Sequence, residues 1–275
     1  ALSRKSKRPV SMNRLIRGRI RDGAWVDQEI LWQADPETYT DTSDLTAGGR
    51  IAFDGRGHVF FSVGMKAPLE FLGIQDLSLP YGKIHRLHDD GRVPADNPFV
   101  KTPGALPSIW TYGHRSPQGL EWNTRTREAW STEMGPRGGD ELNRLLPGRN
   151  YGWPLFTSGV NYDGRPVDVG KALGITLYAR DAEFPVLDLT PSPAISSFVF
   201  YRGRAFPRWR DNIIVGTLRA TDLLRLEIRD NKVVHTEVLL KDLARFRDIE
   251  VGPKGELYVL LENAAGSRIV RLVPD

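Results

Sequence analysis

Short runs of alternating apolar and polar residues, separated by turn-forming residues, recur along this 275-residue chain. Alternation with a period of two predicts half-buried β-strands, and the apolar spacing that predicts amphipathic helices is scarce here. Residues 223–240, LLRLEIRDNKVVHTEVLL, are expected to form a hairpin of two strands with a turn at 229–232. The other predicted strands lie in residues 15–20, 24–32, 51–63, 120–130, 198–201 and 212–218. The chain is therefore expected to be all-β.

A weak internal repeat organises these strands. Each copy has an apolar stretch, a turn with Gly or Asn, and a second apolar run, as in IAFDGRGHVFFSVG, LEWNTRTREAWSTEMG, FVFYRGRAFPRWRDNIIVGTL and IEVGPKGELYVLLEN. The copies start roughly 50 to 80 residues apart, which favours β-propeller blades of about 40 to 50 residues with inserted loops. An ordinary β-sandwich is the alternative.

Residues 1–275 are expected to form a single propeller domain, and its closure raises a question. The chain has material for about five blades, and fewer where insertions are long. A ring that lacks a blade leaves two exposed strand edges, which soluble proteins avoid. Either the chain is part of a longer one, or something else closes the ring.

The composition excludes several classes of site. The chain has no cysteine, so any metal must be held by oxygen or His ligands. The net charge of +4 is small, and nucleic acid is not an expected partner despite the basic run ALSRKSKR at residues 1–8, which reads as a solvated end. No apolar run approaches the roughly 18 residues of a membrane span, and no leader peptide is recognisable.

Several long motifs follow one another in the chain: GGRIAFDGRGHVFFSVG, GKIHRLHDDGRVPADNPF, YGHRSPQG, STEMGPRGGDELN, NYGWP, FPRWRDNIIVGTL and RFRDIEVGPKGELYVL. In this order they resemble the soluble quinoprotein glucose/sorbosone dehydrogenase family, most closely its aldose sugar dehydrogenase branch. The resemblance covers nearly the whole chain. It implies a six-bladed β-propeller that binds pyrroloquinoline quinone and calcium on one face and oxidises sugars at C1.

The same resemblance implies how the protein is used. A sugar substrate and an electron acceptor would be its partners, and its location would be periplasmic or secreted. The oligomeric state cannot be inferred. Against the family pattern the chain begins about two blades late, which agrees with the closure question and removes one quinone contact near the family's N-terminus.

Four arginines are candidates for binding the carboxylates of the quinone, since the planar guanidinium fork can hold two oxygens at once. Arg245 and Arg247 stand two residues apart, so a strand would direct both to one face and Phe246 to the other. Two exposed surface arginines are the alternative reading. The resemblance adds further positions, and the full set of quinone-contacting candidates is Arg115, Ser116, Met134, Tyr162, Ser192, Arg219, Arg245 and Arg247.

Calcium needs six to eight oxygen ligands, many of which can be backbone carbonyls. The resemblance assigns the carbonyls of Gly135 and Pro136 to the calcium that holds the quinone. It assigns Glu141 and the carbonyl of Tyr151 to a second, structural calcium, with Asp140 beside the site as a further catalytic candidate. A turn cap and a salt bridge would be the simpler roles of the two acids.

Catalysis in this family needs a His as general base, and this chain departs from the pattern there. Thr46 stands where the His is expected, and a Thr hydroxyl is far too weak a base at pH 7. None of the five His residues is an obvious substitute, although His114 lies beside Arg115, which is expected to stabilise the reduced quinone. Two further positions depart from the family pattern. Ser116 stands where the family usually has Asn, and Met134 stands where it often has Gln or His.

Two functions from different classes therefore stay open. The first is a sugar dehydrogenase that uses pyrroloquinoline quinone and calcium. The second is a non-catalytic, calcium-stabilised propeller that binds a carbohydrate or a protein. A calcium-dependent lactone or ester hydrolase would need a carboxylate cage that the sequence does not contain.

Overall fold

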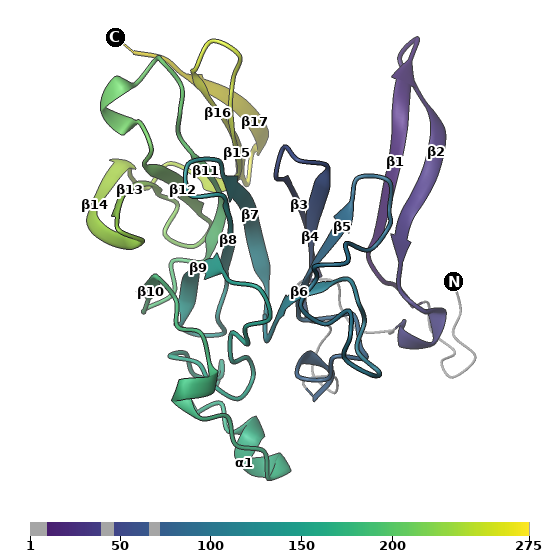
Figure 1. Ribbon diagram of the computed structural model, residues 1–275. Helices are drawn as coiled ribbons and strands as arrows, with labels where there is room; N and C mark the ends of the chain where they lie inside the picture. Colours follow the sequence, from purple (N-terminus) through teal and green to yellow (C-terminus); the bar gives the residue numbers. More distant parts are fainter. Residues whose placement is uncertain (1–9, 40–46, 66–71, 275) are drawn as a thin grey trace. The chain divides into compact units, whose positions relative to one another are not determined.

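The structure is a computed structural model that describes residues 10–39, 47–65 and 72–274 (Figure 1). It divides into two compact units. The first comprises Ala1–Pro117, Leu146–Leu155 and Val169–Glu183, and the second comprises Gln118–Leu145, Phe156–Asp168 and Phe184–Asp275. Each unit is described by itself.

The first unit contains a long antiparallel ribbon and a four-stranded antiparallel sheet. The ribbon pairs β1 (Arg14–Arg21) with β2 (Ala24–Gln33). The sheet has the order β3-β4-β5-β6, formed by β3 (Gly48–Phe53), β4 (His58–Val63), β5 (Lys83–His88) and β6 (Ile109–Tyr112). Its short helices are η1 (Pro36–Thr38), η2 (Leu72–Ile74), α1 (Val169–Leu173) and η3 (Ala179–Asp181).

The predicted strand over residues 51–63 is two strands, β3 and β4, joined by a tight turn. Asp54 builds the turn, because its Oδ1 accepts hydrogen bonds from the backbone N–H groups of Arg56 (2.7 Å) and His58 (3.1 Å). After the turn, nearly every residue of β4 is buried. The core of this sheet consists of Val59, Phe60, Phe61, Ile84, Leu87 and Ile109.

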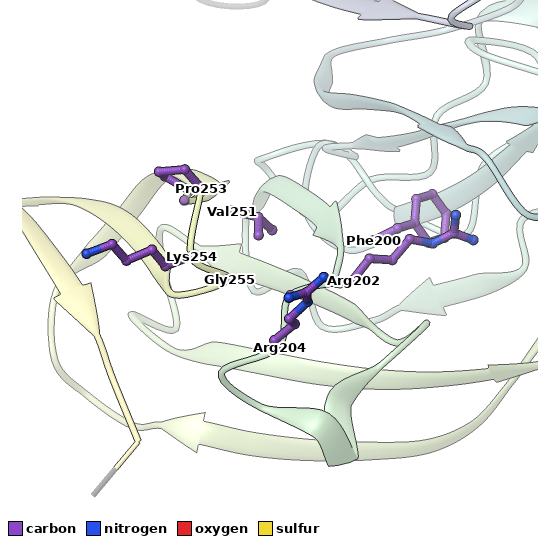
Figure 2. Close-up of a pocket in the computed structure, with 9 residues that line it drawn as sticks. Phe200, Arg202, Arg204, Val251, Pro253, Lys254 and Gly255 are labelled. Atoms are coloured by element: carbon purple, nitrogen blue, oxygen red, sulfur yellow. The ribbon is translucent and has the colours of Figure 1, made fainter.

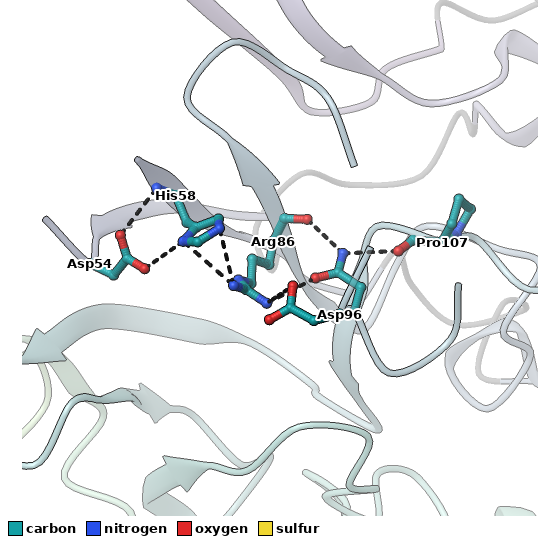
Figure 3. A network of polar contacts seen from close by, with 6 residues as sticks. Asp54, His58, Arg86, Asp96 and Pro107 are labelled. Atoms are coloured by element: carbon teal, nitrogen blue, oxygen red, sulfur yellow. Dashed lines mark hydrogen bonds and ion pairs between the residues drawn. The ribbon is translucent and has the colours of Figure 1, made fainter. Parts of the chain in front are cut away.

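A polar network around Arg86 ties β4 and β5 to the segment that follows β5 (Figure 3). The guanidinium of Arg86 lies 3.0 Å from Asp96 Oδ1 and 3.2 Å from His58 Nε2. Asp54 Oδ2 lies 2.7 Å from the other ring nitrogen of His58. Asn97 Nδ2 donates to the Arg86 carbonyl at 3.0 Å. Within the motif GKIHRLHDDGRVPADNPF, these bonds give Arg86, Asp96 and Asn97 a structural role.

The second unit contains three antiparallel sheets. The order β10-β9-β8-β7 joins β7 (Pro117–Asn123), β8 (Glu128–Glu133), β9 (Asp140–Leu145) and β10 (Leu187–Leu189). The second sheet contains, in order, β11 (Ile195–Phe200), β12 (Ile213–Thr217), β13 (Leu223–Arg229) and β14 (Lys232–Leu240). The third contains β15 (Arg245–Val251), β16 (Leu257–Asn263) and β17 (Gly266–Leu272), and η4 (Pro207–Trp209) precedes β12.

The sheets of the second unit pack through their buried faces. Strand β11 lies against β8 and β15, and β12 also lies against β15. Trp130, Leu142, Ile195, Phe198 and Val215 belong to one buried cluster. A second cluster surrounds the fully buried Tyr201 and Phe246. Alternating sequences therefore pack as layered sheets, as expected from period-two patterns.

The hairpin predicted over residues 223–240 is confirmed as β13 and β14. Arg229 pairs with Lys232, so the turn contains only Asp230 and Asn231. Their φ angles of 48° and 59° are left-handed, which a two-residue hairpin turn requires and which Asp and Asn tolerate. The predicted all-β fold class is confirmed. None of the helices in the described part of the chain is long and apolar enough to span a membrane.

Candidate functional site

The segments YGHRS and NYGWP, separated in the sequence, lie together in the first unit. Tyr151 N donates to Tyr112 O at 2.8 Å, and Trp153 N donates to Gly113 O at 2.9 Å. Gly113 has a φ of 82°, and a Cβ there would lie 2.2 Å from Asn150 Oδ1. Only glycine fits at this close approach.

Arg115 extends from this paired segment. Its guanidinium carbon lies 5.3 Å from the centre of the Trp153 ring, a cation–π distance. Its carbonyl accepts a hydrogen bond of 2.8 Å from Met65 N. Both Arg115 and Ser116 are buried. The cation predicted to face a quinone is thus held on an aromatic surface.

His114 is fully buried between neighbouring side chains. Its Nε2 lies 2.9 Å from Thr111 Oγ1, and its ring stacks on Tyr151 with 4.7 Å between ring centres. Burial lowers the pKa of His114 to about 3. The complete burial of the ring and its stacking on Tyr151 favour a structural role for His114.

Thr46, which the resemblance places at the position of the family His, lies outside the described residues. The chain immediately after it is firmly held. The Ala47 carbonyl accepts from Gly64 N at 2.8 Å. Ser62 Oγ accepts from the backbone N–H groups of Gly49 (3.1 Å) and Arg50 (3.0 Å), which spans a bulge in β3.

In the second unit, Asp140 organises the loop between β8 and β9. Its Oδ1 accepts from Gly135 N at 3.0 Å, and its Oδ2 accepts from Ile195 N at 2.8 Å. Burial raises the pKa of Asp140, while these hydrogen bonds favour the ionised form. Because both oxygens bind the backbone, Asp140 holds the loop against the start of β11.

The same loop crowds carbonyl oxygens around Gly135. A Cβ on Gly135 would lie 2.1 Å from Gly138 O and 2.5 Å from Gly139 O. Gly138 and Gly139 have φ angles of 94° and 68°, a backbone conformation that glycine adopts more easily than other residues. Hard carbonyl oxygens at close range suit calcium.

Glu141 faces a second buried carboxylate across the sheet, because it pairs with Glu133 of β8. Burial, followed by the charge of Glu133, raises the pKa of Glu141. Asn143 Nδ2 donates to Glu141 Oε2 at 2.9 Å, and Asn143 Oδ1 is buried without a hydrogen-bond partner among the described residues. This oxygen-rich cluster fits a hard cation.

No group of three or more His, Cys, Asp or Glu side chains that could hold a metal ion occurs within residues 10–39, 47–65 and 72–274. A cation would therefore depend on carbonyl or amide oxygens for most of its ligands. Glu133 and Asn143 were missed from the sequence. The cross-strand register of β8 and β9, which places Glu133 opposite Glu141, could have indicated the first.

Ser192 and Arg219 contact each other at the start of β11 and just beyond β12. Arg219 Nη1 donates to Ser192 O at 3.1 Å, and Ser192 Oγ accepts from Ala194 N at 3.1 Å. Arg219 is otherwise exposed. Its cation is thus oriented while accessible to a ligand.

Arg245 and Arg247 both bind Glu262 of β16. Arg245 Nε lies 3.4 Å from Glu262 Oε2, and Arg247 Nε donates to the same oxygen. Phe246 between them is fully buried, as the two-residue spacing of the arginines predicts. The pKa of Glu262 is lowered, first by Arg247 and also by Arg245. One carboxylate therefore offsets two guanidinium charges and leaves a net positive charge.

These pieces of the second unit converge on one end of its sheets. Ser196 Oγ donates to the Phe246 carbonyl, which joins β11 to the start of β15. Thr132 Oγ1 donates to Ser196 O at 2.6 Å, which joins β8 to β11. The Asp140 loop, Ser192, Arg219 and the arginine pair therefore occupy neighbouring strand ends.

Met134 and Tyr162 flank this arrangement. Met134 is half-buried directly after β8. Tyr162 follows Val160, whose carbonyl accepts from Arg137 N at 3.0 Å in the loop after Pro136, and Tyr162 is 75% exposed.

Comparison with known proteins assigns nearly the whole chain to one family. The sequence pattern of the Glucose / Sorbosone dehydrogenase family matches residues 2–271. The chain belongs to this family. The resemblance expected from the motifs is confirmed.

Two curated relatives and one solved structure show how similar the family members are. Aldose sugar dehydrogenase YliI of Escherichia coli (strain K12) is 40% identical over 220 residues, which cover 80% of this chain and 58% of the relative. Quinoprotein glucose dehydrogenase B of Acinetobacter calcoaceticus is 27% identical over 68% of this chain and 48% of its own length. A crystal structure of a glucose dehydrogenase matches 98% of this chain and 76% of its own, with a TM-score of 0.89 and 35% identity.

The chain spans about half the length of the curated relatives it matches. The structural match extends over nearly all of this chain and identifies its sheets as those of the dehydrogenase propellers. The predicted propeller fold class is confirmed.

Proposed function

We propose that this member of the Glucose / Sorbosone dehydrogenase family takes part in the pyrroloquinoline quinone and calcium dependent oxidation of aldose sugars at C1. One observation carries the proposal. The carbonyl-rich loop at residues 135–140 is hydrogen-bonded to the start of β11, beside the Ser192–Arg219 contact and the Arg245–Arg247 pair. Hard oxygens next to a net positive charge suit a calcium ion and a polycarboxylate together.

Arg219, Arg245 and Arg247 would hold the carboxylates of the quinone. Arg219 is pre-oriented by Ser192 O, whereas Arg245 and Arg247 share the carboxylate of Glu262, which a ligand carboxylate would replace. A fixed guanidinium fork such as that of Arg219 binds a planar carboxylate with less loss of side-chain freedom. When bound, pyrroloquinoline quinone supplies a two-electron acceptor for the hydride of the sugar C1.

Gly135 and Pro136 would supply carbonyl ligands to the calcium at the quinone. The crowding of Gly135 against the carbonyls of Gly138 and Gly139 supports this role. Asp140 acts as a positioning residue, because its carboxylate binds Gly135 N and Ile195 N. Its proposed contribution to catalysis is therefore indirect.

Glu141 would hold a second calcium in the second unit. The carbonyl of Tyr151, which the resemblance assigns to the same ion, belongs to the first unit. The buried Glu133 opposite Glu141, and the unsatisfied Asn143 Oδ1, support a cation on the Glu141 side. A cation there would relieve the repulsion between two buried carboxylates.

In the first unit, the resemblance assigns Arg115, whose cation is fixed on Trp153, to negative charge on the reduced cofactor, together with Ser116. In the second unit, it assigns Met134, Tyr162 and Ser192 to the cofactor surroundings. The proposed partners are an aldose and an electron acceptor, and the proposed location is periplasmic or secreted.

A second candidate function is a non-catalytic propeller that binds a carbohydrate or a protein partner. Thr46 in place of the family His favours it, because neither a Thr hydroxyl nor the buried His114 can act as an efficient base. The two functions share the calcium-stabilised scaffold and differ in turnover.

The test is a titration of the protein with pyrroloquinoline quinone in the presence of calcium, followed by dye reduction with a panel of aldoses. We expect quinone binding to depend on calcium. The quinone affinity of Arg219→Gln should be lower than that of the parent by about ten-fold or more. Arg268→Gln removes the same charge from an exposed position of β17 and should have little effect. Equal affinities of the two variants would contradict the cofactor site. Tight quinone binding without dye reduction would favour the non-catalytic function.

A further inference from the structure

A pocket of about 640 Å³ opens in the second unit between two turns (Figure 2). One turn follows β11 at Gly203, and the other joins β15 to β16 at residues 252–255. Strand β11 runs from Ile195 to Phe200, so this pocket lies at the opposite end of β11 from Ser192. It also lies at the opposite end of β15 from Arg245. The pocket is therefore separate from the proposed cofactor site.

The two turns are locked together before any ligand binds. Tyr201 is fully buried, and its hydroxyl donates to the Gly255 carbonyl and accepts from Phe206 N at 3.0 Å. A Cβ on Gly203 would lie 2.3 Å from Gly255 O, and one on Gly255 would lie 2.3 Å from Arg204 N. Two glycines thus permit direct contact between the turns. A pocket built this way keeps its shape, which lowers the cost of binding.

The charged side chains that line the pocket are all cationic: Arg202, Arg204 and Lys254. Arg202 is fixed and partly neutralised, with Nε 3.0 Å from Asp211 Oδ1 and Nη1 donating to Thr124 Oγ1. In Figure 2, Arg204 rises toward the middle of the pocket, whereas Lys254 extends outward.

Arg204 makes no ion pair or side-chain hydrogen bond within the described part of the chain, and it is exposed. The adjacent carboxylate of Glu256 is buried next to Gly252, and its Oε1 lies 3.9 Å from Arg271 Nη1. The positive charge of Arg204 is therefore left for a ligand.

Apolar groups complete the lining. Phe200 contributes a half-buried ring that is held edge-on by Trp130, with 5.7 Å between ring centres. Val251 and Pro253 supply aliphatic surface from the other turn. Small-molecule sites typically combine such apolar walls with a few fixed polar groups.

We propose that this pocket binds a small organic anion. Arg204 holds its carboxylate or phosphate, with Arg202 as the second, partly neutralised cation. The apolar part of the ligand packs on Phe200 and Val251. The site acts independently of the cofactor, because no residue that lines it belongs to the proposed dehydrogenase site.

The experiment is isothermal titration of the protein, without added quinone, with phenyl phosphate, benzoate and inorganic phosphate at low ionic strength. Phenyl phosphate or benzoate should bind more tightly than inorganic phosphate, because only they contain an apolar ring; which of the two binds better identifies the anionic group. Arg204→Gln should weaken binding by about ten-fold or more, and Arg204→Lys should restore part of it. Arg208→Gln removes the same charge from η4, outside the pocket, and should weaken binding by less than about two-fold.

Because Arg204 is exposed, its variants should fold like the parent, and thermal unfolding checks this. Equal losses in Arg204→Gln and Arg208→Gln would overturn the proposal, since they would indicate a diffuse electrostatic effect. Equal affinities for inorganic phosphate and for both aromatic anions would also overturn the proposal, because the apolar ring would then contribute nothing to binding. Binding of an acidic peptide but of none of the small anions would also overturn it.

Discussion

The carboxylate of Asp140 accepts a hydrogen bond of 2.8 Å from the backbone N–H of Ile195. This bond joins the first residue of β9 to the first residue of β11. Since the other oxygen of Asp140 binds Gly135 N, one side chain fixes the carbonyl-rich loop against the strand end that leads to Ser192. The geometry of the proposed calcium and quinone sites therefore depends on Asp140.

Asp140→Asn should loosen this junction. An amide has one acceptor oxygen in place of two, so one buried N–H loses its partner, at a cost of about 1–3 kcal/mol in the free energy of unfolding. Urea unfolding measures the loss, and the stabilisation by added calcium should shrink as well. Asp163→Asn changes an exposed carboxylate in a turn of the same unit and serves as the control. If calcium stabilises Asp140→Asn as strongly as the parent, Asp140 does not position the loop.

Glu262→Gln should strengthen quinone binding. The substitution removes a carboxylate that contacts both Arg245 and Arg247, so the ligand no longer competes with it. Absorbance titration should give an affinity about two- to five-fold higher at low salt, and the gain should shrink at high salt.

Glu227→Gln is the matched control, because Glu227 pairs with the exposed Arg229 on β13. It should leave the quinone affinity unchanged. Weaker binding in Glu262→Gln would mean that Glu262 is needed to orient the arginines, and would contradict a competing role.

Local sequence patterns predicted several of the strands, because alternation and turn residues are properties of neighbouring positions. The turn at Asp230 and Asn231 is an example, since both residues tolerate a positive φ. The ranges 51–63 and 120–130 each proved to contain a turn between two strands, and β5, β6, β9, β10 and β17 were not predicted. The sequence also predicted that Arg245 and Arg247 share a face. It did not reveal Glu262 as their partner, although the short turn after β15 places Arg245 opposite Glu262.

Contacts between distant segments were harder to predict. His114 was a possible substitute base in the sequence, and only its packing on Tyr151 and its burial give it a structural role. Likewise, the hydrogen bond from Ile195 to Asp140 spans 55 positions and has no local signature. Family resemblance supplied the candidate residues, and the tertiary structure supplied their partners.

Two buried His residues in the first unit should make its stability depend on pH. Burial lowers the pKa of His85 and of His114 to about 3, from 6.5. Between these values the unfolded chain takes up protons that the folded chain does not. The free energy of unfolding should therefore fall as the pH is lowered through this range, by roughly 1.4 kcal/mol per pH unit for each His.

Urea unfolding from about pH 7 to about pH 4 tests this dependence. His85→Gln should show a shallower loss of stability toward acid, although its stability at neutral pH will be lower, because His85 contacts Ser108 Oγ and Pro80 O, each at 3.0 Å. His235→Gln, at an exposed position, should keep the parental slope. A parental slope in His85→Gln would contradict the proposed burial effect.

Lys83 should be a strong determinant of stability. It is 0% exposed, and its Nζ donates to the carbonyls of Gly73 (3.1 Å), Ile74 (2.9 Å) and Tyr81 (2.8 Å). Burial lowers the pKa of Lys83 to about 7, while the negative charge of Asp76 opposes this shift. Lys83→Met leaves three carbonyls without this donor and should cost roughly 2–4 kcal/mol in urea unfolding.

Lys101→Met is the control for Lys83→Met, since Lys101 is exposed. It should change the free energy of unfolding by less than about 0.5 kcal/mol. Similar losses in the free energy of unfolding of the two variants would show that the ammonium of Lys83 contributes little and that packing of its methylene groups accounts for its effect.

Thr46→His should raise dye-reduction turnover if the protein is a dehydrogenase that lacks only its base. Imidazole titrates near neutral pH and can take the hydroxyl proton of the sugar, which a Thr hydroxyl cannot, so the gain should be about 100-fold or more. Thr42→His introduces the same side chain four residues earlier and should give no gain. The rate of Thr46→His should also decline as the imidazole is protonated below about pH 6.5. Unchanged turnover in a variant that binds the quinone as the parent does would contradict the placement of Thr46 at the family His.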